Sequence, residues 1–146
     1  MPKPSSPKIK GFHSLNSKNF HPFGNLIGLV FTKIEKGYSQ CTLKIGQNHF
    51  NPHKTVHGGV LYSMADTGMG AAIYSLLEKN ESCATIEIKI SYFKPVREGE
   101  LRCDTKVIHR GKSFGVLESE IINGETLVSK AYGTFSIFKV KKAKKD

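Results

Sequence analysis

The sequence predicts an α+β domain in which a curled antiparallel sheet of about six strands wraps around one long central helix. Residues 59–79 form a helical segment that is nearly apolar all round, and such a helix is surrounded by protein. The segments on either side alternate apolar and polar residues and have short connections, which is typical of antiparallel strands. We therefore expect the sheet to curl over the helix and a second subunit to cover the remainder.

Length and composition are those of an ordinary single domain. The chain has 146 residues, of which 38% are hydrophobic and 23% are charged, so it can bury a core of its own. No apolar run is long enough to span a membrane without polar interruption, and the N-terminus lacks the apolar region of a secretory signal. We expect a cytoplasmic protein. The three cysteines are far apart and form no CxxC pair, which favours free core thiols over disulfides or a zinc site.

The net charge of +10 is concentrated at the two ends of the chain. Residues 1–18 carry four lysines and no acidic residue, and residues 139–146 carry five lysines and one aspartate. We expect a flexible N-terminal arm over residues 1–18, the folded domain over residues 19–139 and a basic tail over residues 140–146. No motif of interleaved aromatic and basic residues accompanies the tails, so nucleic acid is not the expected partner.

The elements before the long helix are short. Residues 19–28 predict a short helix or turn, and residues 29–45 predict two strands joined by the turn EKGY. Residues 46–57 have no periodicity and contain an Asn-Pro pair, which indicates a loop. The apolar residues of the segment 59–79 then recur at helical spacing.

Four strands are expected after the helix. Residues 85–93 alternate strictly, which places Ile86, Ile88, Ile90 and Tyr92 on one face and Thr85 on the other. Three further strands follow with turns between them, over residues 101–109, 114–122 and 126–140.

One charged side chain, Asp66, lies in the middle of the apolar helix. A carboxylate on a buried helix is costly unless it is paired, hydrogen-bonded or used in chemistry. Asp66 therefore has one of two roles. It is a structural cap or the partner of a lysine at the domain edge, or it takes part in the chemistry. The helix opens with His57, Gly58 and Gly59, where unpaired N–H groups and the helix dipole could bind a carbonyl oxygen that gains charge. The alternative is a plain turn into a helix.

The spacing of these residues predicts a dimer. Gly58 and Asp66 are eight residues apart, about 12 Å along the helix axis, so one helix cannot bring its own carboxylate to its own first amides. Two antiparallel helices related by a two-fold axis could do so, which predicts two equivalent sites at an isologous interface. Gly68 and Gly70 would ease the approach of the two helices.

The stretch NPHKTVHGGVLYSMADTGMGAA resembles the signature of hotdog-fold acyl-CoA thioesterases, in the branch of the phenylacetate-degradation and 4-hydroxybenzoyl-CoA thioesterases. Asn51, the three residues 57–59 and Asp66 fit the pattern of an asparagine, a short loop, His-Gly-Gly and an acidic residue eight positions after the first glycine. The similarity continues through SCATIEIKISYFKPVREGE and VIHRGKSFGVLESEI, and covers residues 22–138. Lys54 departs from the family, because relatives often have glycine there.

The resemblance implies hydrolysis of an acyl-CoA thioester to a free acid and coenzyme A, without a metal or a separate cofactor. It implies that the thioester carbonyl binds the Gly58 backbone N–H, assisted by Gly59. Asp66 of the other subunit would be the nucleophile or the general base that activates water.

Further roles are implied by the same resemblance. Asn51 would help to place the carboxylate or the attacking water, Thr85 would position water beside the acid, and His57 would orient the loop and the helix start. Coenzyme A phosphates would lie near Arg110, Gly111, Lys112 and Ser113, although such a turn can also be simply solvated. The family forms dimers with a continuous sheet and often dimers of dimers, so a homotetramer is expected.

Other functions compete with this one. A hotdog dehydratase or hydratase would rely on His57 together with an acid, and a non-catalytic module would bind acyl-CoA or nucleic acid without turnover. His49, His53 and His57 recur every four residues, as metal ligands on a helix would, but Asn51-Pro52 argues against a helix. We interpret them as separate loop histidines.

Overall fold

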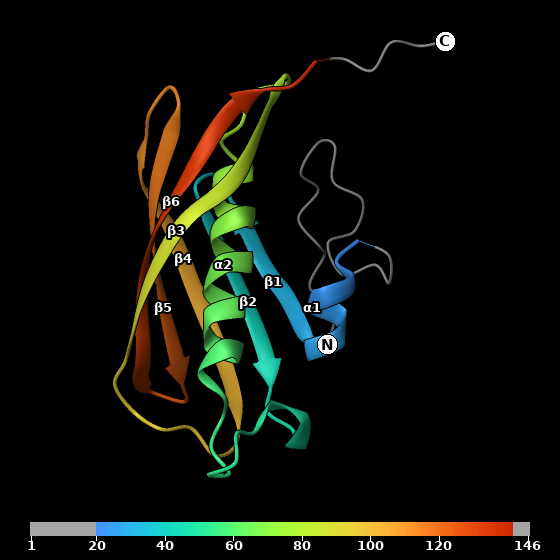
Figure 1. Cartoon of the computed structure of the whole chain (residues 1–146), viewed down its shortest axis with the longest axis vertical. Coiled ribbons are helices and arrows are strands. Elements are labelled where there is room, and N and C mark those ends of the chain that lie inside the picture. The colour runs from blue at the N-terminus through green and yellow to red at the C-terminus, as the bar shows by residue number, and fades with distance from the viewer. Residues whose placement is uncertain (1–19, 142–146) are drawn as a thin grey trace.

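A computed structural model describes residues 20–141, so the expected arm over residues 1–18 and residues 142–146 of the tail lie outside the described residues. A six-stranded antiparallel sheet curls around one long helix, α2 (Figure 1). This confirms the predicted α+β architecture. The elements are α1 (Pro22–Ile27), β1 (Leu29–Glu35), β2 (Tyr38–Lys44), the 3-10 turn η1 (Gln47–His49), α2 (Gly58–Tyr74), β3 (Glu81–Tyr92), β4 (Glu100–Arg110), β5 (Phe114–Asn123) and β6 (Thr126–Lys139).

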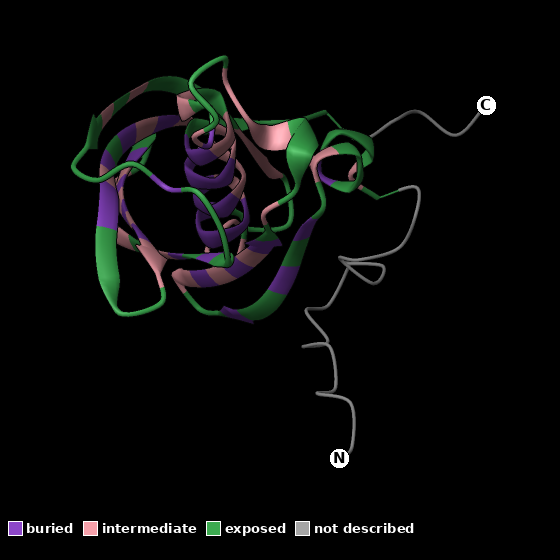
Figure 2. Ribbon diagram, turned by 90° about the horizontal axis from the view of Figure 1, so that it is seen from below, coloured by how far each residue is buried: buried purple, intermediate pink, exposed green. Residues whose placement is uncertain are grey.

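The strand order is β1-β2-β4-β5-β6-β3, and every neighbouring pair is antiparallel. The helix leads from β2 to β3, which lies at the far edge of the sheet beside β6. Figure 2 shows α2 inside the curl, with its buried faces against the sheet. The second edge of β3 is unpaired within residues 20–141.

One side of α2 is open in the single chain. Tyr62 and Tyr74 are 38% and 42% exposed, and Asp66 and Gly70 between them are partly exposed. These four residues are spaced by four, so they form one ridge along the helix. We expected a second subunit to cover this side of the helix, which a single chain does not test. We call these four residues the open ridge of α2.

The helix is shorter than predicted, because it ends at Tyr74 instead of Lys79. The hydroxyl of Ser75 donates to the Ala72 carbonyl at 2.6 Å and accepts from the Gly37 N–H at 2.8 Å. These bonds connect the C-terminal end of α2 to the turn between β1 and β2. Leu77 lies beyond the helix and still packs against the core. Apolar spacing thus continues past the end of the helix.

Strand β3 begins at Glu81 and contains a bulge between Thr85 and Glu87, where it pairs with β6. Thr85 and Ile88 are three residues apart, which would place them on opposite faces of a regular strand. The extra residue of the bulge turns both side chains toward α2, since Thr85 contacts Asp66 and Ile88 packs against the core. The prediction that Thr85 faces away from Ile88 is therefore wrong, and Ile86 is 59% exposed.

Beneath the middle of α2, three hydroxyl side chains are buried within the core. Ser39 donates to the Gly68 carbonyl at 2.6 Å, and Thr105 and Ser119 share a hydrogen bond of 2.7 Å. A Cβ added at Gly68 would lie 2.8 Å from Thr105 Oγ1. Gly68 therefore lets α2 approach its own sheet, and its expected role between two helices is wrong. We call Ser39, Thr105 and Ser119 the hydroxyl layer.

The three cysteines are free thiols, as predicted. Cys41 and Cys103 are fully buried and lie opposite each other on β2 and β4. Cys83 is half-buried, and its burial raises the pKa of the thiol. Among residues 20–141, no helix has the length and apolar character required to cross a membrane.

Candidate active site

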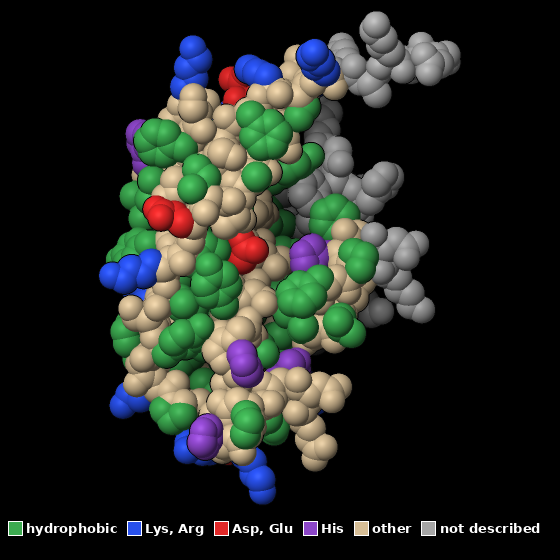
Figure 3. All heavy atoms as spheres, in the orientation of Figure 1, with side chains coloured by type: hydrophobic (Ala, Val, Ile, Leu, Met, Phe, Trp, Pro, Cys, Tyr) green, Lys and Arg blue, Asp and Glu red, His purple; other side chains and the backbone are tan. Residues whose placement is uncertain are grey.

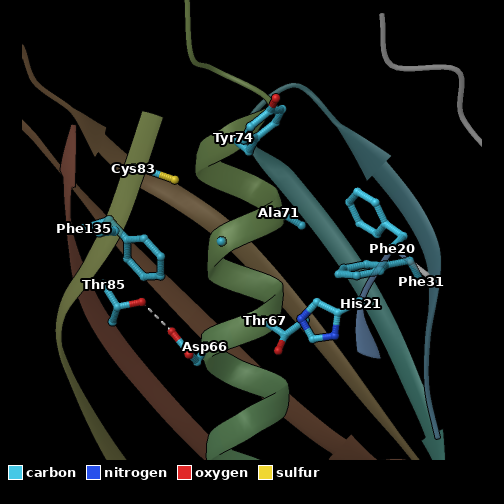
Figure 4. Close-up of a pocket in the computed structure, with 12 residues that line it drawn as sticks. Phe20, His21, Phe31, Asp66, Thr67, Ala71, Tyr74, Cys83, Thr85 and Phe135 are labelled. Carbon is cyan, nitrogen blue, oxygen red and sulfur yellow. Dashed lines mark hydrogen bonds between the residues drawn. The ribbon is translucent and has the colours of Figure 1, made fainter. Parts of the chain in front are cut away.

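Asp66 lies halfway along α2 and meets Thr85 of the edge strand. The Thr85 hydroxyl donates to Asp66 Oδ1 at 2.7 Å (Figure 4). Within residues 20–141, no lysine, arginine or histidine forms an ion pair with this carboxylate. The interpretation of Asp66 as a structural partner of a lysine therefore does not hold for the part of the chain that the structure describes.

Asp66 and Thr85 form part of the wall of a pocket of about 300 Å³. In Figure 4, Phe20, His21 and Phe31 lie on one side of α2, and Cys83 and Phe135 lie on the other. Most of the remaining wall is apolar or aromatic, and the complete lining is Phe20, His21, Phe31, Asp66, Thr67, Gly70, Ala71, Tyr74, Cys83, Ala84, Thr85 and Phe135. The pocket can thus hold an apolar group beside a single carboxylate.

Hydrophobic and basic side chains occupy different parts of the surrounding surface. Figure 3 shows that exposed hydrophobic side chains cover much of the face that carries α2 and β3, whereas lysines and arginines lie mainly toward its ends and its β-sheet side. The described part of the chain therefore presents a largely hydrophobic face with a few acidic groups in it, and positive charge at the periphery.

At the start of α2, one backbone donor is free and the next is engaged. His57 is the N-cap residue, and its Nδ1 accepts a hydrogen bond from the Gly59 N–H at 2.8 Å. Within residues 20–141, the Gly58 N–H has no hydrogen-bond acceptor. Of the two glycine amides expected to assist a carbonyl, the structure thus leaves that of Gly58 available.

Tyr92 completes this end of the site and was not predicted. Its hydroxyl donates to the Gly58 carbonyl at 2.8 Å, so the last residue of β3 is bonded to the first residue of α2. Burial is the main cause that raises the pKa of Tyr92, and the electrostatic interaction with Tyr62 raises it further. The hydroxyl therefore keeps its proton at neutral pH. Alternation along β3 placed Tyr92 on the same face as three isoleucines, and a tyrosine that packs beside them needs a partner for its hydroxyl. That need was the available signal.

Asn51 shapes the loop that precedes the helix. Its Oδ1 accepts from the backbone N–H groups of His53 at 2.9 Å and Thr55 at 3.3 Å, and its Nδ2 donates to Thr55 Oγ1 at 2.9 Å. Lys54 in the same loop has a φ of 60°, in the left-handed region that glycine adopts without strain. This geometry explains why a glycine suits the position. The predicted role of Asn51 beside the acid is not tested by these contacts.

The turn after β4 contains the predicted phosphate-binding residues. Arg110 is bonded to the Glu81 carboxylate and to the Gly111 carbonyl, whereas Lys112 and Ser113 are exposed. The backbone N–H of Glu78 and then Arg110 lower the pKa of Glu81. Since Arg110 has an internal partner, Lys112 is the more accessible cation of this turn. The turn lies near the C-terminal end of α2, far from Gly58, because a Cβ at Gly115 would meet Ile73.

The loop histidines do not converge. His49 donates from Nε2 to the Ile27 carbonyl at 2.7 Å and accepts at Nδ1 from the Gly46 N–H, whereas His57 caps α2. In the described range 20–141, no three His, Cys, Asp or Glu side chains form a group suited to a metal ion. His49 and His57 thus bond to separate backbone groups.

Similarity to known proteins follows this geometry. The model of the thioesterase superfamily matches residues 53–130, which include the helix start, Asp66, Thr85 and the turn after β4. The acyl-coenzyme A thioesterase PaaI of Escherichia coli is 29% identical over 98 residues, which cover 66% of this chain and 68% of that protein. A protein of Saccharolobus solfataricus, SSO1253, is 33% identical over 116 residues, 79% of this chain and 77% of the relative.

Solved structures share the same fold. The conserved protein PA5202 from Pseudomonas aeruginosa is 34% identical, with a TM-score of 0.77 over 80% of this chain and 93% of that chain. The E. coli PaaI protein, at 24% identity, has a TM-score of 0.73 over 81% of this chain and 86% of its own. With its hotdog fold and a family match over more than half of its length, the chain belongs to the thioesterase superfamily and is a thioester hydrolase.

Proposed function

We propose that the protein is an acyl-CoA thioesterase in which Asp66 is the nucleophile or general base and the Gly58 N–H of a second subunit polarises the carbonyl. The observation that carries the proposal is the hydrogen bond of 2.7 Å from Thr85 to Asp66 Oδ1, at the wall of an apolar pocket. Thr85 orients one carboxylate oxygen, and within residues 20–141 the other has no partner that would compete with a water or an acyl carbon.

The reaction follows from these groups. As general base, Asp66 takes a proton from water while the water oxygen attacks the thioester carbon. The carbonyl oxygen gains negative charge, which the Gly58 N–H and the positive end of the α2 dipole stabilise. The tetrahedral intermediate then collapses, the C–S bond breaks, and the departing sulfur takes up the proton. As nucleophile, Asp66 would attack the carbonyl carbon, and the C–S bond would break to release coenzyme A as its thiolate, which takes up a proton from water. Water would then hydrolyse the mixed anhydride to the free acid and regenerate Asp66.

A complete site needs a second copy of this chain. Asp66 and Gly58 are eight residues apart on one helix, about 12 Å along its axis. The open ridge of α2 and the unpaired edge of β3 supply a surface on which a partner could bring its own Gly58 to Asp66. A homodimer or dimer of dimers, including the predicted homotetramer, is part of this proposal. The cytoplasmic location, the absence of a cofactor and a coenzyme A site at residues 110–113 stay predictions.

The dehydratase alternative is disfavoured by the state of His57. Its Nδ1 already accepts from the Gly59 N–H, so a neutral ring carries its proton on Nε2. Neither nitrogen is then a free base. The alternative of a non-catalytic binding module is disfavoured by membership of the thioesterase superfamily.

The test is release of free thiol from a panel of short, long and aromatic acyl-CoAs. Asp66→Asn removes the acid and retains the shape, so kcat is expected to fall by a factor on the order of 10³ for any substrate that the wild type hydrolyses. Glu87→Gln is the matched control, because Glu87 is an exposed carboxylate on β3 close in sequence to Thr85. It should leave kcat unchanged.

Two results would contradict the proposal. A wild-type protein that releases no thiol from any acyl-CoA would remove the substrate class. A folded Asp66→Asn variant with undiminished kcat would remove Asp66 from the chemistry.

A further inference from the structure

The peptide group that joins Gly58 to Gly59 is held at both of its polar atoms. Its carbonyl oxygen accepts from the Tyr92 hydroxyl at 2.8 Å. Its N–H donates to His57 Nδ1 at 2.8 Å. Because a peptide group is planar, two hydrogen bonds on opposite sides fix its orientation.

This restraint matters because Gly58 is otherwise a flexible residue. Glycine leaves room for Tyr92 here, since a Cβ at Gly58 would lie 3.0 Å from Cζ and Oη of the tyrosine, a tight contact. Glycine also has the widest conformational freedom of any residue, so an N–H carried by it is poorly directed unless something else fixes the backbone. The bonds from Tyr92 and His57 supply that restraint on one side of the Gly58 Cα.

We propose that Tyr92 is a positioning residue for the Gly58 oxyanion donor. The inference rests on the proposed function, in which the Gly58 N–H stabilises the charge on the thioester oxygen. Tyr92 acts through the Gly58–Gly59 peptide and does not touch the substrate. The apolar–polar alternation of β3 does not predict this positioning role for Tyr92.

The geometry points to the hydroxyl group more than to the ring. Tyr92 is 51% exposed, so burial of its ring accounts for only part of its contribution. The hydroxyl is protonated at neutral pH and has the Gly58 carbonyl as its acceptor. Strand β3 thus contacts both proposed catalytic groups. Thr85 bonds to the Asp66 carboxylate, and Tyr92 bonds to the Gly58 carbonyl.

A second tyrosine provides a matched control. Tyr62 of α2 donates through its hydroxyl to the Ile88 carbonyl of β3 at 3.3 Å. It also connects α2 with β3 and is similarly exposed, but it does not touch Gly58. Tyr62 lies on the open ridge of α2, but its hydroxyl bonds to the Ile88 carbonyl of the same chain. Phenylalanine there keeps the ring of that ridge, so each replacement by phenylalanine removes only one hydroxyl from the same junction.

The experiment measures kcat and KM of Tyr92→Phe and Tyr62→Phe with an acyl-CoA that the wild type hydrolyses. Complete removal of an oxyanion donor costs about 10²–10³ in kcat, so a donor that is present but less well directed is expected to cost roughly tenfold. For Tyr92→Phe we expect kcat to fall by that factor and KM to stay within twofold. Tyr62→Phe should keep both constants, and both variants should melt within a few degrees of the wild type.

The outcomes separate this inference from the proposed function. If Tyr92→Phe matches Tyr62→Phe in kcat, or raises KM alone, the positioning role is wrong, while loss of activity in Asp66→Asn would still support the proposed function. If the wild type hydrolyses no thioester, both fall together. A loss of kcat matched by an equal loss in Tyr62→Phe would reveal a merely structural junction and would also overturn the role.

Discussion

The side chain of Thr85 shows how one local irregularity places a functional group. The bulge in β3 turns Thr85 toward α2, where its hydroxyl meets Asp66 Oδ1 at 2.7 Å. A hydrogen bond to an ionised group contributes about 1.5–3 kcal/mol, more than a neutral one. Thr85 therefore orients the carboxylate that it contacts.

Replacement of Thr85 by valine tests this contact at the residue scale. Valine has nearly the same shape and lacks the donor, so we expect kcat to fall by about tenfold or more while the melting temperature changes little. Thr85→Ser restores the hydroxyl and should recover most of the activity. Equal kcat values for the valine and serine variants would show that the hydroxyl is not used.

At this scale the sequence located some residues and missed others. The resemblance placed Thr85 beside the acid, although simple alternation put it on the wrong face because it cannot reveal a bulge. Tyr92 received no role, since its partner Gly58 is 34 positions earlier in the chain and meets it only when the helix start lies against the edge strand. Contacts of that kind depend on tertiary structure and not on periodicity.

The helix α2 depends on small residues as much as on large ones. Gly68 lies over the hydroxyl layer, where a methyl group would come within 2.8 Å of Thr105 Oγ1. Thr105 cannot move freely, because its hydroxyl is bonded to Ser119. Among residues 20–141, Phe135 alone lies near the missing Cβ of Gly70, at 3.9 Å.

Alanine substitutions at these two glycines should have opposite effects. Gly68→Ala is expected to lower the free energy of unfolding by about 1–3 kcal/mol through overpacking. Gly70→Ala should raise it by up to about 1 kcal/mol, because alanine is the better helix former. Denaturant titration of both variants measures the difference. A Gly68→Ala protein as stable as Gly70→Ala would show that the contact beneath Gly68 can relax.

Element types were more predictable than their ends. Strict alternation and turn residues predicted all six strands, and the evenly apolar segment predicted a central helix. The helix end was placed five residues too late, because Leu76 and Leu77 continue the apolar spacing after Ser75 has closed the helix. Side-chain bonds to backbone groups of distant turns decide such boundaries.

The whole molecule has one face that a second copy would complete. Along the open ridge of α2, the aromatic residues Tyr62 and Tyr74 flank Asp66 and Gly70, and the edge of β3 beside it has unpaired backbone groups within residues 20–141. Exposed strand edges and apolar patches are common sites of self-association. The proposed two-subunit site uses this same face.

Mixed oligomers provide the test at this scale. Asp66→Asn removes the acid, and Gly58→Pro removes the N–H donor at a first helical position where proline is tolerated. The Cβ of proline requires the half-exposed Tyr92 ring to shift by a few tenths of an ångström. The extended ψ of 134° at His57 also suits a residue before proline. If each site takes Asp66 from one chain and Gly58 from the other, a 1:1 mixture refolded together should regain about a quarter of the wild-type activity, because half of the dimers carry one intact site.

Controls for this mixture are simple. Each variant alone should be nearly inactive and should have the same molecular mass in solution as the wild type. A mixture that stays as inactive as its components would show that both groups act within one chain.

The hydroxyl layer has a consequence for the opposite side of the helix. An evenly apolar helix buries almost the same area at several rotations about its axis. Hydrophobic packing alone therefore does not fix the rotation of α2. The bond from Ser39 to the Gly68 carbonyl and the narrow gap over Thr105 are satisfied at one angle and one depth. Asp66 stands two residues before Gly68, about 3 Å along the axis, so its alignment with Thr85 is set from the buried side. Substitutions in the hydroxyl layer would therefore change the catalytic rate as well as the melting temperature.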